Sequence, residues 1–339
     1  MPVGVAVVGC GYWGPNLVRN FWESEEVELR WVCDLVPERL EKIRKRYPAV
    51  KLTTSLDEVL ADTGVDGVCL ATPSHTHFAL AKLVLEANRH VLVEKPLCDN
   101  SEHVERLMEL AEQRGKVLMV DHTFLYNPAV RAVRGILDSG RLGKLLYFDS
   151  TRVNLGLFQR DVNVLWDLAV HDLAMMDYLI HDRRPIAISA TGIAHVTGQP
   201  ENMAYLTCFY DDNLVAHIHA NWLAPVKLRR TLLGGEKQMI VYDDLEPSER
   251  IKVYDKGITV SDEKEIHNLL ISYRSGDCWS PKIPPGEALE NEVAHFAECI
   301  RDGLRPLSDG LAGLRVVKMI EAGTLSMRQR GAPVELNLP

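Results

Sequence analysis

Apolar runs alternate with amphipathic stretches along the first 120 residues. Continuous apolar runs, typical of buried parallel strands, occur at residues 3–8, 29–33, 67–71, 90–94 and 116–120, and a shorter strand is expected at 51–53. Residues with helical spacing between them predict helices at 37–47, 55–61, 78–87 and 102–114, and one beginning at Pro15. Strand and helix in strict alternation predict an α/β fold with a doubly wound parallel sheet, forming a domain of residues 1–121.

The pattern changes after Asp121. Longer strands joined by turn signals are expected at residues 145–153, 186–194, 204–210, 214–222, 229–234, 238–243 and 250–254. Helices are expected at 127–139, 164–180, 289–301 and 311–328. We therefore expect a second α/β domain, residues 122–339, with a large open and mostly antiparallel sheet covered by helices on one face. Its other face would be wet or covered by another subunit, which favours a homodimer or homotetramer.

Composition narrows the class of protein. The 339 residues carry a net charge of −9 without long runs of one sign, so neither nucleic acid nor an anionic membrane is an expected partner. No stretch is apolar enough to span a bilayer, and the chain enters its first strand without a signal peptide. The seven cysteines form no CxxC pair, and three of them lie in or beside predicted strands. This usage is typical of a reducing cytoplasm.

The first strand ends in a glycine motif, Gly9-Cys10-Gly11-Tyr12-Trp13-Gly14. In such a motif the first glycine permits a tight turn, the second lets the backbone approach a pyrophosphate, and the third lets the helix pack close to the strand. The helix that follows offers unpaired N–H groups and a positive dipole end to phosphates. The motif alone can be only a turn, but between a strand and a helix it predicts a dinucleotide site.

An acidic residue follows at the expected distance. Asp34 ends the second strand, twenty residues after Gly14, where a carboxylate can accept hydrogen bonds from both ribose hydroxyls and repel a 2′-phosphate. Leu35 and Val36 supply no cation. We therefore predict NAD rather than NADP as the cofactor. The alternative is that Asp34 only caps the helix that begins near Pro37.

Further candidate cofactor-binding residues follow the strands at the same edge of the predicted sheet, where ligands bind in open parallel sheets. They are Thr72, Pro73, His75, His77, Glu94, Lys95 and Pro96. Lys95 is held extended by the following proline and could exchange a proton with a substrate hydroxyl. The alternative for this residue is a solvated lysine at a strand end.

A second candidate pair lies in the predicted helix 164–180. Asp167 and His171 are four residues apart and share a helix face, so the carboxylate could orient the imidazole and raise its basicity as a general base. Asp172 would point about 100° away, to pair on the surface or cap locally. The alternative is a structural histidine held by a helix neighbour.

These motifs occur together in one known family. The glycine motif, Ala71-Thr72-Pro73…His77, Glu94-Lys95-Pro96 and Asp167-x-x-x-His171 resemble, over essentially the full chain, the Gfo/Idh/MocA oxidoreductases. The resemblance implies a Rossmann domain followed by a substrate-binding α/β domain, NAD(P) use, and hydride transfer at a secondary alcohol of a sugar or cyclitol. It implies that Lys95 is the catalytic lysine and His171 the acid/base, supported by Asp167. The family often has a basic residue just before the Asn127-Pro128 position, where this chain has Leu125-Tyr126.

The substrate class is suggested by one further stretch. This stretch resembles the corresponding stretch of family members that oxidise carbon 3 of nucleotide-linked amino sugars, such as UDP-N-acetylglucosamine or its uronic acid. The residues that carry the resemblance are Arg152, Asn154, Arg160, Asp161, Asn163 and Trp166. The arginines could bind a diphosphate or carboxylate, and the other polar groups sugar hydroxyls. Rival hypotheses are a dehydrogenase of inositol or free sugars, a glycosidase of the same fold that retains NAD, and a regulator without turnover.

Two histidine pairs raise the possibility of a metal. His75-x-His77 and His217-x-His219 could each place two rings on one side of a strand. No third ligand stands at a recognisable spacing, so we predict no metal site.

Overall fold

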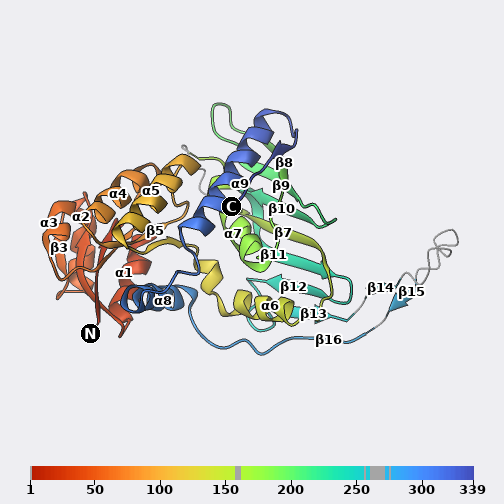
Figure 1. Cartoon of the computed structure of the whole chain (residues 1–339), viewed down its shortest axis with the longest axis horizontal. Coiled ribbons are helices and arrows are strands. Elements are labelled where there is room, and N and C mark those ends of the chain that lie inside the picture. Colours follow the sequence, from red (N-terminus) through yellow and green to blue (C-terminus); the bar gives the residue numbers. More distant parts are fainter. Residues whose placement is uncertain (1, 157–161, 256, 260–271, 275) are drawn as a thin grey trace. The chain divides into compact units, whose positions relative to one another are not determined.

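The computed structural model describes residues 2–156, 162–255, 257–259, 272–274 and 276–339. The chain forms two compact units. The first contains Met1–Asn127, Gly286–Lys318 and Pro339, and the second contains Pro128–Pro285 and Met319–Leu338. Figure 1 shows their elements coloured along the chain. Each unit is described separately below.

The first unit is built on a six-stranded sheet of order β3-β2-β1-β4-β5-β6, in which all neighbouring strands are parallel. The predicted doubly wound parallel sheet is thus confirmed. Its strands are β1 (Val3–Val8), β2 (Val27–Cys33), β3 (Lys51–Thr53), β4 (Gly67–Leu70), β5 (His90–Glu94) and β6 (Leu118–Asp121). Its N-terminal helices are α1 (Gly14–Glu23), α2 (Pro37–Arg46), α3 (Leu56–Ala61), α4 (His77–Glu86) and α5 (Ser101–Arg114), with short 3-10 turns η1 (Ser74–Thr76) and η2 (Thr123–Tyr126).

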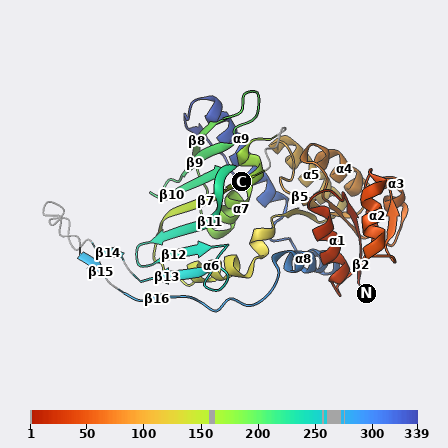
Figure 2. The same ribbon diagram turned by 180° about the vertical axis from the view of Figure 1, so that it is seen from behind.

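The helices cover both faces of this sheet. Figures 1 and 2 show α4 and α5 side by side on one face, and α1 beside α8 (Ala288–Asp302) on the other. We expected residues 122–339 to form the second domain, so the return of residues 286–318 to the first unit corrects that boundary. Phe296 of α8 packs edge-on against Phe21 with ring centroids 6.5 Å apart. A Cβ at Gly67 of β4 would lie 3.1 Å from the Phe296 ring, so the strand leaves room for this helix. Such packing depends on distant residues, which periodicity along the chain does not reveal.

The second unit contains a nine-stranded sheet of order β16-β13-β12-β11-β7-β10-β9-β8-β17. Only β7 and β10 pair in parallel among its described neighbours, which confirms the expected mostly antiparallel open sheet. Its strands are β7 (Leu145–Leu155), β8 (Ala187–Ile193), β9 (Met203–Phe209), β10 (Val215–Asn221), β11 (Leu223–Gly235), β12 (Met239–Asp243), β13 (Ile251–Tyr254), β16 (Cys278–Trp279) and β17 (Val334–Glu335). Strands β14 (Gly257–Thr259) and β15 (Ser272–Arg274) form a separate pair.

Helices cover one face of the nine-stranded sheet (Figure 2). They are α6 (Pro128–Asp138), a π-helical turn η3 (Leu165–Ala169), α7 (Val170–Leu179) and the later part of α9 (Gly310–Arg328). Burial alternates along the strands as the pleat requires: Leu206 and Ile218 are buried, whereas Tyr205 and Phe209 are exposed. Among the described residues of this unit, the second face of the sheet is therefore open. No helix in the described part of the chain combines the length and apolarity of a bilayer-spanning segment.

Candidate active site

The glycine turn has the geometry that its spacing predicts. Gly9 adopts φ +100°, and a Cβ there would lie 2.5 Å from the Ala71 carbonyl oxygen. A Cβ on Gly14 would lie 2.0 Å from the Gly9 oxygen, so neither position accepts a side chain. By contrast, a Cβ on Gly11 would meet no atom within 4 Å. The turn therefore leaves open space beside its backbone, just before the N-terminus of α1, as a bound pyrophosphate requires.

Asp34 holds this turn from the next strand. Its carboxylate is 5% exposed and accepts hydrogen bonds from the backbone N–H groups of Cys10 at 2.6 Å and Val36 at 2.8 Å. Nη1 of Arg39 lies 3.3 Å from Oδ2 of Asp34. Leu35 and Val36, the two residues after Asp34, gave no sign of this cation, because it is the first turns of α2 that bring Arg39 back to the strand end. The glycine turn and the Asp34 carboxylate together fit a dinucleotide, and the Arg39 guanidinium partly offsets the negative charge of Asp34.

His77 links the ends of two neighbouring strands. Its ring is 1% exposed, with Nδ1 2.9 Å from the Pro96 oxygen and Nε2 2.8 Å from the Thr72 oxygen. Burial lowers the pKa of this imidazole. His77, which is predicted to line the cofactor site, is thus buried and fixes the Thr72 and Pro96 segments. Pro73 and His75 lie exposed in the same turn, and His75 stands on a 3-10 turn rather than a strand.

Lys95 follows β5 and is partly buried, and its peptide bond to Pro96 is cis. Glu94 is also partly buried and pairs in register with Asp121 on β6. Next to Asp121, His122 is 2% exposed. Burial and, second, the nearby Lys95 charge lower the pKa of His122 to about 3, so this imidazole is neutral at physiological pH. This neighbour of Lys95 is therefore not a second cation, because His122 is neutral.

In the second unit, the predicted helix 164–180 is interrupted by a π-helical turn. Asn163 is 7% exposed and caps this turn, because its Oδ1 accepts hydrogen bonds from the N–H groups of Leu165 at 3.1 Å and Trp166 at 3.4 Å. Asp167 lies in the turn, and its Oδ2 accepts a 2.9 Å hydrogen bond from Nε1 of Trp222. His171 follows in the first turn of α7 and is partly buried. Single-turn π segments often occur at functional sites, but no residue spacing in the sequence predicted this one.

Asp172 and Arg152 form a buried ion pair that the sequence did not predict. Predicted to lie at the surface, it is 1% exposed, because eight of the ten residues of α7 are buried. Its carboxylate accepts from Nε of Arg152 at 2.6 Å and from the hydroxyl of Ser150 at 2.7 Å. Arg152 was predicted to bind a substrate anion but is itself 2% exposed in this ion pair. Its position therefore favours a structural role, which a sequence without tertiary contacts could not reveal.

The structure describes some of the other predicted substrate residues and not the rest. Asn154 on β7 and Trp166 in the π-helical turn are partly buried, whereas Arg160 and Asp161 lie outside the described residues. His217 and His219 lie on the open side of β10, where the Tyr205 ring stacks on His219 with centroids 4.3 Å apart. Among the described residues, no three histidine, cysteine or carboxylate groups gather as metal ligands.

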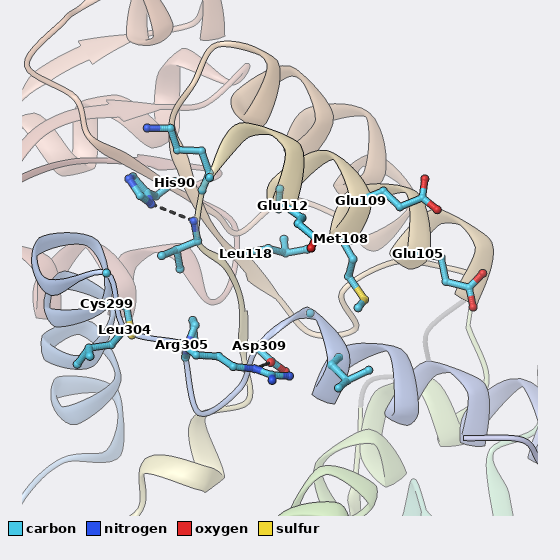
Figure 3. Close-up of a pocket in the computed structure, with 18 residues that line it drawn as sticks. His90, Glu105, Met108, Glu109, Glu112, Leu118, Cys299, Leu304, Arg305 and Asp309 are labelled. Carbon is cyan, nitrogen blue, oxygen red and sulfur yellow. Dashed lines mark hydrogen bonds and ion pairs between the residues drawn. The ribbon is translucent and has the colours of Figure 1, made fainter. Parts of the chain in front are cut away.

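A groove of about 780 Å³ lies elsewhere in the first unit (Figure 3). His90 and Leu118, which begin β5 and β6, line it together with Met108 of α5 and Leu304. The groove is thus at the amino ends of these strands. Ligand sites in open α/β sheets lie at the carboxyl ends, where the glycine turn and Lys95 are found. None of the predicted site residues lines the groove.

Comparison with protein families decides the assignment. Residues 3–122 match the family "Oxidoreductase family, NAD-binding Rossmann fold", and residues 130–241 match "GFO/IDH/MocA C-terminal domain". The chain belongs to the Gfo/Idh/MocA oxidoreductases. Its first unit is accordingly an NAD-binding Rossmann domain, and the protein is an NAD-dependent oxidoreductase that acts on CH–OH groups.

Several relatives are similar over most of their length. UDP-N-acetylglucosamine 3-dehydrogenase from Acidithiobacillus ferrooxidans is 28% identical over 92% of this chain and 93% of its own, and its solved structure superposes with a TM-score of 0.81 over 97% and 99% of the two chains. The scyllo-inositol 2-dehydrogenase (NAD(+)) of Bacillus subtilis is 23% identical over 99% of this chain and 97% of its own. The WlbA dehydrogenase of Bordetella pertussis, solved with NADH and UDP-GlcNAcA, has a TM-score of 0.82 at 19% identity over 100% and 99% of the chains.

Proposed function

We propose that this protein oxidises carbon 3 of a nucleotide-linked amino sugar, such as UDP-N-acetylglucosamine or its uronic acid. The observation that carries the proposal is the full-length similarity to UDP-N-acetylglucosamine 3-dehydrogenase. The fold shared with a dehydrogenase solved with NADH and UDP-GlcNAcA is consistent with it. The similarity to scyllo-inositol 2-dehydrogenase supports a second candidate, a cyclitol or free-sugar substrate.

The residues divide the chemistry between binding and proton transfer. Gly9, Gly11, Gly14 and Asp34 would hold NAD, which accepts the hydride released from the substrate carbon. In the proposal, the hydroxyl proton passes to the imidazole of His171, and the Lys95 ammonium polarises the same oxygen as it becomes a carbonyl. Asp167 would hold the His171 ring in the basic tautomer.

We further propose that the enzyme acts in the cytoplasm as a homodimer or homotetramer. All seven cysteines are free thiols, as expected in a reducing compartment. On the open face of the nine-stranded sheet, exposed Tyr147 and Phe209 flank exposed Val215 of β10 as its register partners, and exposed Tyr205 lies further along β9, a surface that a second copy could cover. Sedimentation equilibrium of the purified protein tests this proposal, and a monomer at micromolar concentration would reject it.

The substrate is tested by NAD reduction with a panel of UDP-N-acetylglucosamine, its uronic acid, myo-inositol and glucose, with the carbonyl product trapped. NADH formed only with a nucleotide sugar supports the first proposal. NADH formed only with inositol or glucose rejects it in favour of the second. No net NADH with any sugar, together with NAD that copurifies, would favour a mechanism that retains the cofactor, as in a glycosidase.

The catalytic assignment is tested separately. Lys95→Ala and His171→Ala should each reduce turnover at least about a hundredfold, because the first removes the cation that polarises the substrate oxygen and the second removes the base that takes its proton, and both should still bind NADH. Lys82→Ala and His181→Ala are matched controls at exposed positions and should keep full turnover. Full activity in either test variant would remove that residue from the mechanism.

A further inference from the structure

A buried group of acids lies behind the cofactor turn. Strands β5 and β6 place Glu94 and Asp121 as register partners, and Glu292 of α8 approaches them from the helix that covers this face. Glu292 is 0% exposed and Asp121 is 1% exposed. Neither acid is part of the mechanism proposed above.

Asp121 connects this group to the glycine motif. Its Oδ2 accepts a 3.1 Å hydrogen bond from Nε1 of Trp13, and its Oδ1 accepts one from the hydroxyl of Thr123 at 2.5 Å. Both oxygens of this carboxylate therefore act as hydrogen-bond acceptors. Trp13 occupies the N-cap position of α1, between Gly11 and Gly14. Asp121 therefore holds the indole beside the helix N-terminus, where dinucleotide phosphates bind.

Glu292 has a different environment. Its buried carboxyl group lies beside the Asp121 carboxylate and the Thr123 hydroxyl, and that hydroxyl already donates its proton to Asp121. Burial and, second, the neighbouring Asp121 carboxylate raise the pKa of Glu292 well above its usual range. An ionised carboxylate without donors is costly to bury, whereas a protonated one can itself donate to Asp121.

The other ionisable groups that face Glu292 reinforce this assignment. They are Cys69 on β4, Glu94 on β5, Asp121 on β6 and Tyr126 in η2. Burial raises the pKa of the Cys69 thiol and of the Tyr126 phenol, so both stay neutral. None of these groups is a cation, and an ionised Glu292 would add a further negative charge beside Asp121 and Glu94.

We propose that Glu292 is a positioning residue for the cofactor: it keeps its proton, donates it in a hydrogen bond to Asp121, and thereby fixes the carboxylate that holds Trp13 at the start of α1. The proposal concerns NAD binding and does not depend on which sugar the enzyme oxidises.

The test is the Kd for NADH, measured from nucleotide fluorescence without substrate. Glu292→Gln preserves a neutral side chain that can donate to Asp121, and it should bind NADH within about twofold of the wild type. Glu292→Ala should raise the Kd about five- to tenfold, through loss of one hydrogen-bonded support. Trp13→Phe, which keeps an aromatic ring but removes the indole N–H, should raise the Kd by a similar factor. The Kd of the double variant Trp13→Phe/Glu292→Ala should not exceed the higher of the two single-variant Kd values, because both changes break the same chain of contacts.

Two results would overturn the proposal. One is a Glu292→Gln variant that binds NADH much more weakly than the wild type, which would mean that Glu292 acts as an anion. The other is a Glu292→Ala effect on the Kd that is either absent or independent of the Trp13 effect. If Glu292→Ala does not fold, the Glu292→Gln and Trp13→Phe measurements still decide: tight binding in the first with weak binding in the second supports the proposal, and any other combination rejects it. A failure of the sugar panel would leave these measurements unaffected.

Discussion

The indole Nε1 of Trp222 lies 2.9 Å from Oδ2 of Asp167 and donates a hydrogen bond to it. Trp222 is 1% exposed, so its ring is fixed by packing, and it orients the acid proposed to support His171. Trp222→Phe should keep the packing but lower turnover about tenfold, since a hydrogen bond to a charged group is lost. The pH–rate profile should shift with it, while the Kd for NADH stays unchanged.

Trp22→Phe is a matched control for that variant, because Trp22 is 43% exposed and belongs to the first unit. It should leave turnover unaltered. A Trp222→Phe enzyme with wild-type turnover and pH profile would show that the Asp167 orientation does not matter for catalysis.

The buried ion pair of Arg152 and Asp172 should be needed for stability. Asp172→Asn leaves the guanidinium without its counter-charge at a position that is 2% exposed, so we expect a loss of about 3–5 kcal/mol in the free energy of unfolding. Replacing both, as Arg152→Met/Asp172→Leu, should cost less than either single change, because no unpaired charge remains. Urea unfolding of the wild type, Asp172→Asn, Arg152→Met and the double variant measures these differences in the free energy of unfolding. If Arg152→Met folds with unchanged stability and instead loses substrate affinity, the residue binds substrate after all.

Asp34 and Arg39 should set the cofactor preference. Asp34→Ala removes the acceptor for the ribose hydroxyls and frees Arg39 to meet a 2′-phosphate, so the Kd for NADH should rise about tenfold and that for NADPH should fall. Arg39→Ala is the control and should preserve the preference for NADH. Fluorescence titration of both nucleotides gives the ratio. An unchanged ratio in Asp34→Ala would remove Asp34 from ribose recognition.

His90, drawn at the groove in Figure 3, should make the protein sensitive to acid. Its Nδ1 accepts a 3.0 Å hydrogen bond from the Val117 N–H, and burial together with the Lys116 charge lowers the pKa of His90 to about 4. The folded pKa lies below the unfolded value near 6.5, so this stability is complete above pH 6.5 and is lost as the pH falls toward 4.

His90→Asn keeps an acceptor at this site but does not titrate. Between pH 7 and pH 4.5 the wild type should therefore lose about 2 kcal/mol more of its unfolding free energy than the variant does. Urea unfolding at both pH values checks this, and equal losses would show that the folded protein protonates His90 at about the same pH as the unfolded chain does.

Local patterns predicted much of the fold. The parallel sheet, the glycine turn and the alternation of β9 and β10 follow from periodicity and from turn chemistry, which act over a few residues. The family motifs also led to the NAD-binding domain. Lys95, His171 and Asp167 remain predicted catalytic residues, each at a position consistent with that role but still to be tested.

The parts that could not be predicted depend on contacts between distant residues. Trp222 is 55 positions from the Asp167 that it holds. Asp172 faces β7 because α7 is covered on nearly every side, so a helical wheel that assumes one solvent face misplaces it. Arg39 was missed because only the two residues after Asp34 were considered, although a helix brings back the fifth. Glu292 carries no sequence signal for its burial beside another acid.

The return of α8 to the first unit has a consequence for how the protein is made. As the chain leaves the ribosome, residues 1–127 emerge before α8, so the part of their sheet around Gly67 that Phe296 and Ile300 cover stays exposed until residue 302 has been added. The cofactor domain therefore completes its core only after most of the second unit has been synthesised. During that interval an apolar sheet face is open to chaperones, and a nascent chain arrested early would be prone to aggregate.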